Sequence, residues 1–449
     1  GITLTMKLSR ELDVDMHHTN SDMTLNLALV YTHVDSPKNH QTALQLYSKY
    51  LHEHPDSNRA KLGKALIYIE QEDWRNADEL LKDVVAEESD SAVALSHYSW
   101  VKMHLGELDE SITNFKKALA LFTGMDVPSL RIRSVNMWRL ANCYIKKYDE
   151  CKESEFLNLS FKYLIESIKC TDDFAQGFST LGVLYATYYN DPVRAFLCFH
   201  KSFSINCGDM KAAEYMVTQF TRDNQWDSAA LVCRDLIQSQ LVKRELQVAN
   251  WPYRVLGISF LEVQNPEDSI EWFQAALRVQ PEDIESLVGL GQAYLQCGKV
   301  ESALKVFNKA LDIVPTHVYS RYFYAVTLGH LGNFNESLAA FKELLALPAH
   351  SQNECFHVSY ATVLVSYAET INSQGFLLKS VDLAAETIET IQHVRMSLNS
   401  NNQSLWTLLC RALKLFLSVR SKMDSLPVET IVDIFQTVDF SKVETHETI

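Results

Sequence analysis

Glycine and proline are scarce in this chain of 449 residues, with 14 and 10 copies respectively. Both residues mark turns, bulges and linkers, so their scarcity disfavours a sheet-rich fold and long connecting segments. Apolar runs long enough to cross a membrane are missing, and residues 1–10 lack the apolar core of a signal peptide. We therefore expect a helical protein with short turns and no membrane partner.

Basic residues are in the minority, with 41 Lys and Arg against 56 Asp and Glu and a net charge of −15. An acidic surface repels a phosphate backbone, so we expect that direct RNA contact does not dominate, although a local basic patch stays open. The nine cysteines include no C-x-x-C pair. An odd, scattered set of this kind indicates a reducing compartment.

A period of 34 residues organises the centre of the chain. Repeats begin at Asn250, Ile284 and Val318, which are 34 residues apart (284 − 250 and 318 − 284). Each has a small residue at its eighth position and a phenylalanine at its twenty-fourth: Gly257, Gly291 and Ala325, then Phe273, Phe307 and Phe341. This pattern is typical of the tetratricopeptide repeat (TPR). It predicts an all-α fold, a TPR helical-repeat solenoid that forms a right-handed superhelix of antiparallel helix pairs, with non-consensus C-terminal helices.

Weaker copies of the pattern extend the array in both directions. We expect an N-terminal segment at 1–21, about nine TPR repeats over 22–351 that are clearest at 250–351, and a divergent helical continuation or cap at 352–449. A polar insertion at 147–155 should separate the two helices of one repeat. Later helices are expected at 357–370, 376–398, 405–419 and after Pro427. Because the chain does not begin with Met, we expect an internal piece of a longer protein or ordered segments joined together.

Motifs that could carry chemistry have better structural explanations. Gly289-Leu-Gly291 follows no strand and lies within a TPR helix, so packing is favoured over dinucleotide binding. His52 and His54 end a helix and lack a third ligand, which favours a solvated turn over a metal site. No catalytic constellation remains, so we expect neither an enzyme nor a cofactor.

First helices of TPR repeats line a concave groove in which partners bind. TPR spacing places these side chains in the groove of the three clear repeats: Trp251, Arg254, Ile258, Leu261, Val288, Gln292, Leu295, Tyr319 and Tyr322. The set is apolar and aromatic with few donors, unlike the clamp of Lys, Arg and Asn that holds a terminal carboxylate. We predict a partner-binding groove with Tyr319 and Tyr322 open and Tyr324 packed between repeats. The alternative is that neighbouring repeats, or the helices after Ser351, bury part of the set.

Several off-consensus stretches are more specific than the repeat itself. They lie at 31–47, 177–196, 250–262, 269–294, 373–381 and 426–435, and include GFSTLGVLYATYYNDPVRAF, NWPYRVLGISFLE and LPVETIVDIF. In these stretches the chain resembles the large TPR scaffold subunit of the superkiller (Ski) complex in its fungal form. The resemblance covers nearly the whole chain but only the middle of that longer protein.

The resemblance implies a non-catalytic scaffold in a cytoplasmic assembly, with a nuclear location also open. In that assembly the scaffold holds a DExH-type RNA helicase and two copies of a WD40 propeller subunit. The complex supports 3′-to-5′ messenger RNA decay by the RNA exosome, including decay of messages on stalled ribosomes. No motif of the family assigns individual contact residues in this sequence.

Two other classes of function stay open. One is a TPR adaptor, or chaperone-type peptide receptor, which would bind acidic tail peptides. The lack of Lys and Asn pairs in the groove argues against it. The other is the regulatory TPR part of an enzyme whose catalytic domain lies outside these residues.

Overall fold

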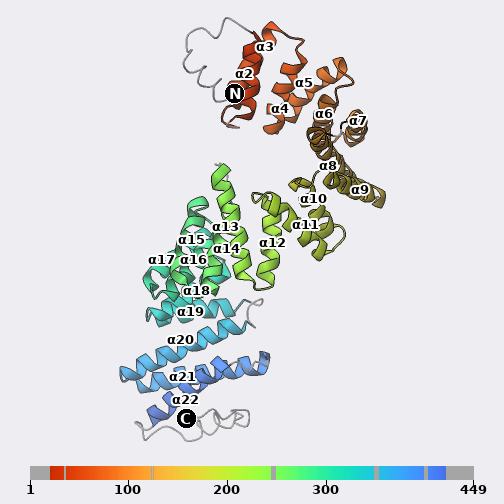
Figure 1. Cartoon of the computed structure of the whole chain (residues 1–449). Coiled ribbons are helices and arrows are strands. Elements are labelled where there is room, and N and C mark those ends of the chain that lie inside the picture. Colours follow the sequence, from red (N-terminus) through yellow and green to blue (C-terminus); the bar gives the residue numbers. More distant parts are fainter. Residues whose placement is uncertain are drawn as a thin grey trace, which may run out of the picture. The chain divides into compact units, whose positions relative to one another are not determined.

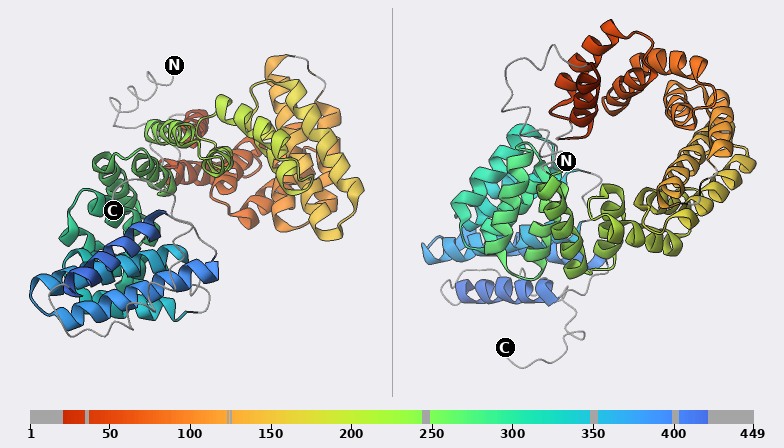
Figure 2. Two further views of the ribbon diagram at one scale, coloured as in Figure 1. Left: turned by 90° about the horizontal axis from the view of Figure 1, so that it is seen from below. Right: turned by 45° about the horizontal axis from the view of Figure 1, so that its top comes forward.

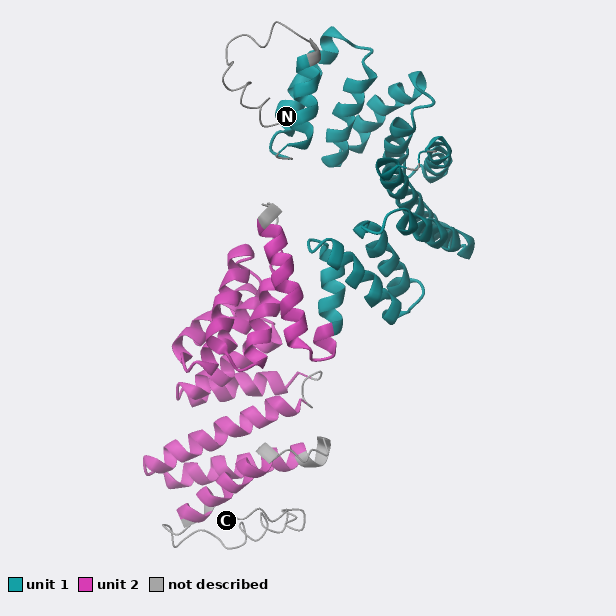
Figure 3. Cartoon of the chain, in the orientation of Figure 1, with its two compact units in different colours: residues 1–219 teal, residues 220–449 magenta. Residues whose placement is uncertain are grey.

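The computed structural model describes residues 21–34, 37–122, 124, 126–243, 249–347, 353–398 and 403–420. These residues form 21 helices and no strand, which confirms the predicted all-α repeat fold (Figure 1). The chain divides into two compact units, Gly1–Gln219 and Phe220–Ile449, called unit 1 and unit 2 below (Figure 3). Residues 1–20 and the helix expected after Pro427 lie outside the described residues.

The helices of unit 1 pack against one another in chain order. They are α2 (Ser21–His33), α3 (His40–Glu53), α4 (Asn58–Glu70), α5 (Trp74–Glu87), α6 (Ala92–Leu105), α7 (Leu108–Leu121), α8 (Val127–Cys151), α9 (Ser154–Cys170), α10 (Ala175–Thr187) and α11 (Pro192–Ile205). Helix α12 (Met210–Arg222) contains the boundary between the two units.

The helices of unit 2 also follow one another as packed pairs (Figure 2). They are α13 (Trp226–Lys243), α14 (Trp251–Glu262), α15 (Pro266–Val279), α16 (Ile284–Gln296), α17 (Val300–Ile313), α18 (Val318–His330), α19 (Phe334–Leu345), α20 (Glu354–Ser373), α21 (Leu377–Leu398) and α22 (Gln403–Arg420). The three clear repeats of the sequence are therefore the pairs α14–α15, α16–α17 and α18–α19.

The small residues of the repeat lie where helices approach most closely. A Cβ added at Gly291 would come closer than 3.0 Å to the ring of Phe307, and one at Gly257 would meet the ring of Phe273 in the same way. The far side of the Phe273 ring faces Gly289 in the following repeat. Both phenylalanines are fully buried. Each ring therefore fills a space that a glycine leaves open, within a repeat and between repeats, as the sequence predicts.

In several repeats, a serine of the second helix donates a hydrogen bond to the backbone of the first helix. The Ser269 hydroxyl donates a hydrogen bond to the Gly257 carbonyl over 2.8 Å, and Ser337 donates to the Ala325 carbonyl over 2.7 Å. Both pairs are 12 residues apart, and both serines are fully buried. The bond satisfies a buried hydroxyl while fixing the crossing of the two helices.

The same serine-to-carbonyl hydrogen bond occurs beyond residue 351. Ser380 of α21 donates to the Ala368 carbonyl of α20 over 3.0 Å, again 12 residues apart. The turn between these helices contains Gly375 in the left-handed region with φ of 87°, and Gly298 has φ of 71° in the turn between α16 and α17. The pair α20–α21 therefore repeats the internal geometry of the central TPR repeats despite its divergent sequence.

The expectation that residues 147–155 separate two helices is wrong. Helix α8 continues to Cys151, and α9 already begins at Ser154. Lys152 makes the turn in the left-handed region, with φ of 58°. Polar residues of the segment occupy helix positions, and Asp149 accepts a hydrogen bond from the Tyr188 hydroxyl at 2.9 Å. The insertion therefore lengthens both helices, because a polar segment can remain helical where one of its faces finds a neighbour.

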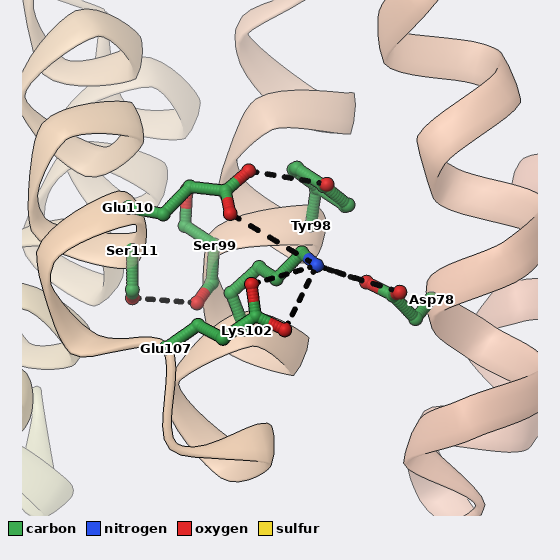
Figure 4. Close-up of polar contacts among 7 residues, drawn as sticks. All are labelled: Asp78, Tyr98, Ser99, Lys102, Glu107, Glu110 and Ser111. Carbon is green, nitrogen blue, oxygen red and sulfur yellow. Dashed lines mark hydrogen bonds and ion pairs between the residues drawn. The ribbon is translucent and has the colours of Figure 1, made fainter.

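A buried lysine connects two neighbouring repeats in unit 1 (Figure 4). The Lys102 Nζ of α6 lies 3.2 Å from an Asp78 oxygen of α5 and 3.1 Å from a Glu107 oxygen at the start of α7. The Tyr98 hydroxyl donates to Glu110 in the same cluster. Burial alone lowers the pKa of Lys102, but its hydrogen bonds to Glu107 and Asp78 outweigh burial and raise it above the ordinary value of 10.5. Lys102 is therefore a charged structural link.

Candidate partner-binding groove

Four of the nine predicted groove residues line one hollow in unit 2. Ile258 and Leu261 come from α14, and Gln292 and Leu295 come from α16. The hollow has a volume of about 410 Å³, and Phe323 of α18 closes one side. It therefore lies across the first helices of three successive repeats, as the TPR spacing predicts.

The rim of the hollow is polar and includes residues that the sequence analysis missed. They are Glu262, Gln264 and Gln296, at or just beyond the ends of α14 and α16. Gln264 has φ of 58° in a turn position that glycine occupies in other repeats, which turns the chain at the rim. Such a hollow suits a segment of a partner protein that places an apolar side chain against the apolar floor. The backbone of that segment would make hydrogen bonds with the amide groups at the rim. Phe323 was missed because TPR spacing alone does not mark its position as groove-facing.

Arg254, the one cation of the predicted set, is already paired. Its Nη1 lies 3.2 Å from an Asp283 oxygen and 2.8 Å from a Glu285 oxygen at the start of α16. Asp283 also caps α16 by accepting a hydrogen bond from the Ser286 backbone N–H. The arginine thus links two repeats, and its charge is compensated within the protein. This agrees with a groove that does not clamp a terminal carboxylate.

The placement of Val288 in an open groove is wrong. Its side chain is only 9% exposed and belongs to a cluster with Ala303 and Phe307. Val288 lies on α16 one turn before Gln292, but the helices next to α16 cover it. Trp251 is half-buried at the start of α14, away from the residues that line the hollow.

Tyr319 and Tyr322 do not share an environment. The Tyr319 side chain is 56% exposed, as predicted, but the openness predicted for Tyr322 is wrong. The Tyr322 ring stacks on Phe356 of α20 with a centroid distance of 4.7 Å, and its hydroxyl lies 2.7 Å from the Ser359 hydroxyl. Helix α20 therefore covers Tyr322. Tyr324 packs against the cluster that contains Phe307, as predicted.

The described residues contain no group of three or more His, Cys, Asp or Glu side chains that could hold a metal ion. His54 ends α3, and its ring lies against Tyr50 at 4.8 Å. No helix in the described part of the chain has the length and apolarity needed to cross a membrane. All nine cysteines are free thiols.

Comparisons with known proteins agree with this architecture. Tetratricopeptide repeat family models match residues 37–97 and 254–318. Superkiller protein 3 of Saccharomyces cerevisiae is 41% identical over 99% of this chain, and Superkiller protein 3 of Schizosaccharomyces pombe is 28% identical over 98%. The chain spans 31% of the length of each of these relatives.

A weaker similarity involves a peptide receptor. The peroxisomal targeting signal receptor of Candida glabrata is 30% identical over 34% of this chain, and the match covers 27% of that receptor. The alignments to the two superkiller relatives, in contrast, extend over 98–99% of this chain. The chain is a Superkiller protein 3-like tetratricopeptide-repeat protein.

Proposed function

We propose that this chain is a non-catalytic scaffold segment of a cytoplasmic RNA-decay complex. The observation that carries the proposal is its similarity to Superkiller protein 3 along almost its whole length. A repeat solenoid supports this role, because successive helix pairs present long surfaces without enclosing an active site. The chain spans 31% of that relative's length, so the proposal concerns the role of this segment.

The proposed partners are a DExH-type RNA helicase and two copies of a WD40 propeller subunit. The helicase performs the chemistry, and the assembly supports 3′-to-5′ decay by the exosome, including decay of messages held on ribosomes. The hollow of unit 2 favours a protein partner, because its floor is apolar and the nearby Arg254 is already neutralised. A nucleic acid backbone would need several unpaired cations.

Affinity purification of the full-length protein at low salt tests the assignment. Mass spectrometry should identify a helicase in an amount close to that of the scaffold and a propeller protein at two copies per scaffold. Their absence under gentle conditions would lead us to reject a superkiller-type role.

A second arm tests the hollow itself. The Leu261→Lys, Leu295→Lys variant places two charges at its apolar floor, where hot-spot changes typically cost about 2 kcal/mol or more of binding free energy. Val279→Lys is the matched control, because Val279 is 40% exposed at the end of α15 and outside the hollow. Loss of one partner from the first variant alone supports binding in the hollow. Retention of every partner with a normal melting temperature removes the hollow from the interface but leaves the scaffold assignment intact.

The peptide-receptor alternative predicts binding of acidic C-terminal peptides in unit 2. The similarity to a peroxisomal targeting signal receptor favours it, but the pairing of Arg254 argues against a carboxylate clamp there. Titration of the chain with such peptides, followed by fluorescence anisotropy, separates the two. A Kd in the micromolar range that Arg254→Ala abolishes would favour the receptor.

A further inference from the structure

Four aromatic side chains form a continuous strip across neighbouring repeats of unit 1. Trp74 and His104 are stacked at 3.9 Å with an interplanar angle of 4°, and Trp100 lies 4.8 Å from His104. Trp138 then follows at 5.5 Å from Trp100. These residues belong to α5, α6 and α8, and all four are partly exposed. Trp74, His104, Trp100 and Trp138 are called the aromatic strip below.

Arg139 lies beside this strip without an acidic partner. Its guanidinium carbon is 5.2 Å from the centroid of the Trp100 ring, and Nη1 donates a hydrogen bond to the Ser96 hydroxyl over 3.1 Å. Its Nε is buried and has no hydrogen-bond partner among the described residues. Burial lowers the pKa of Arg139 to about 10, and no carboxylate opposes that effect. Two other cations of α8 do have acidic partners, since Arg131 pairs with Asp173 and Lys147 with Asp109.

The surroundings of Arg139 add positive charge but no negative charge. Lys146 is exposed on the same helix, and its Nζ donates a hydrogen bond to the Met103 carbonyl over 3.5 Å, with no ion pair to a described residue. Burial, then Lys146 and Arg139, lower the pKa of His104 to about 4. Burial and Arg139 lower the pKa of His97 to about 3. His97 Nδ1 and His104 Nε2 are buried without partners in the described structure. The region therefore holds uncompensated positive charge in a chain of net charge −15.

We propose that the aromatic strip, with Arg139 and Lys146, binds an internal segment of a partner protein through one acidic side chain. The carboxylate pairs with the guanidinium of Arg139 and supplies a counter-charge to it. The ammonium of Lys146, which acts on His104 together with Arg139, adds to the electrostatic attraction. A neighbouring apolar or proline side chain packs on the partly exposed Trp138, next to Trp100. This binding surface is in unit 1 and does not depend on which complex the protein joins.

A protein segment suits the strip better than RNA does. Bases stack on open ring faces, but Trp74 is already stacked on His104, and Arg139 lies over Trp100. Two cations are also too few to follow a phosphate backbone. A terminal carboxylate would need additional charged and amide donors of the kind found in TPR clamps.

Selection of random peptides displayed on phage against the 449-residue chain tests the proposal. We expect enriched peptides to carry Asp or Glu next to an aromatic residue or proline. Synthetic copies should bind equally well with a free or an amidated C-terminus, and replacing the acid by its amide should weaken binding by at least about tenfold. A U-rich RNA oligonucleotide serves as the second probe.

Variants then locate the binding surface. Arg139→Gln should weaken the selected peptides by at least about tenfold. Lys146→Glu, at an exposed position that leaves the core intact, should weaken them in the same direction. Lys147→Gln is the matched control, since Lys147 is already paired with Asp109, and it should bind as the unaltered chain does. The proposal is overturned if the selection yields no acidic peptides, or if Lys146→Glu leaves peptide binding unchanged. Tight binding of the RNA without peptide binding also overturns it.

Discussion

Replacing Gly291 with leucine should destabilise the repeat formed by α16 and α17. A Cβ at this position comes closer than 3.0 Å to Phe307 ring atoms, whereas ordinary contacts lie at 3.4–4 Å. The Phe307 ring is fully buried, so in a close-packed interior it can move only by displacing its neighbours. Overpacking of this kind costs up to about 3 kcal/mol, and the better helix propensity of leucine returns about 1 kcal/mol. We expect a net loss of about 2 kcal/mol in unfolding free energy.

Thermal denaturation and hydrogen exchange measure this loss. For a cooperative unit of roughly 200 residues, the expected decrease in melting temperature is about 4–8 °C. Because each repeat contacts mainly its neighbours, faster exchange should be confined to α15–α18. Gln296→Ala, at an exposed position of the same helix, is the control and should change stability by less than about 0.5 kcal/mol.

A double mutant tests the cause. Phe307→Leu makes room above residue 291, so the double mutant should be more stable than the sum of the single losses by at least about 1 kcal/mol. Strict additivity would show that the contact between residues 291 and 307 is not the source of the loss. Uniformly faster exchange over residues 21–420 would contradict the local nature of repeat stability.

Three further predictions, which use four substitutions, test the packing. Tyr322→Ala should lower the free energy of unfolding by about 2–4 kcal/mol, because α20 covers the ring. Tyr319→Ala should change it by less than about 0.5 kcal/mol, because that side chain is exposed. Equal melting temperatures of the two variants would contradict this difference. Ser337→Ala removes a buried hydrogen bond and should cost about 1 kcal/mol in chemical denaturation. Lys102→Met should lower the free energy of unfolding by about 1–3 kcal/mol, and this loss should be the same at every pH from about 6 to 9. Because the pKa of Lys102 is raised, its ammonium contributes fully to the free energy of unfolding at every pH below 10.5. The pKa of Glu107 is lowered, first of all by its hydrogen bond to Lys102, so its carboxylate contributes fully at every pH above 4.5. The loss should therefore shrink as the pH falls below 4.5, and a loss that changes between pH 6 and pH 9 would argue against the ion pairs.

The helix pairs and their crossings could be predicted because the relevant interactions are local. Gly257 meets Phe273 within one repeat, and Ser269 reaches the Gly257 carbonyl 12 residues away. Interactions over such short separations repeat with the period of the sequence, so 34-residue spacing reveals them. Four of the eight residues that line the hollow of unit 2 were predicted for the same reason.

Some departures from the predictions arise where the chain leaves the consensus. The segment at 147–155 was expected to be a connection, but α8 and α9 extend through most of it, and Asp149 accepts a hydrogen bond from Tyr188 in the next repeat. Polarity alone does not distinguish a loop from an exposed helix turn. The sequence left open whether the helices after residue 351 continue the repeat or form a cap. Divergent residues replace the repeat's aromatics there, although Ala368, Gly375 and Ser380 keep their places in α20 and α21.

The sequence by itself determined the helical repeat, its 34-residue period and the first helices that could form a groove, because these depend on contacts within and between adjacent repeats. Only the tertiary structure decided which groove side chains stay open. Tyr322 is covered by α20, Arg254 is neutralised by Asp283 and Glu285, and Val288 is enclosed, whereas Arg139 has no acidic partner among the described residues. Exposure and charge compensation at these positions depend on helices that no fixed spacing assigns.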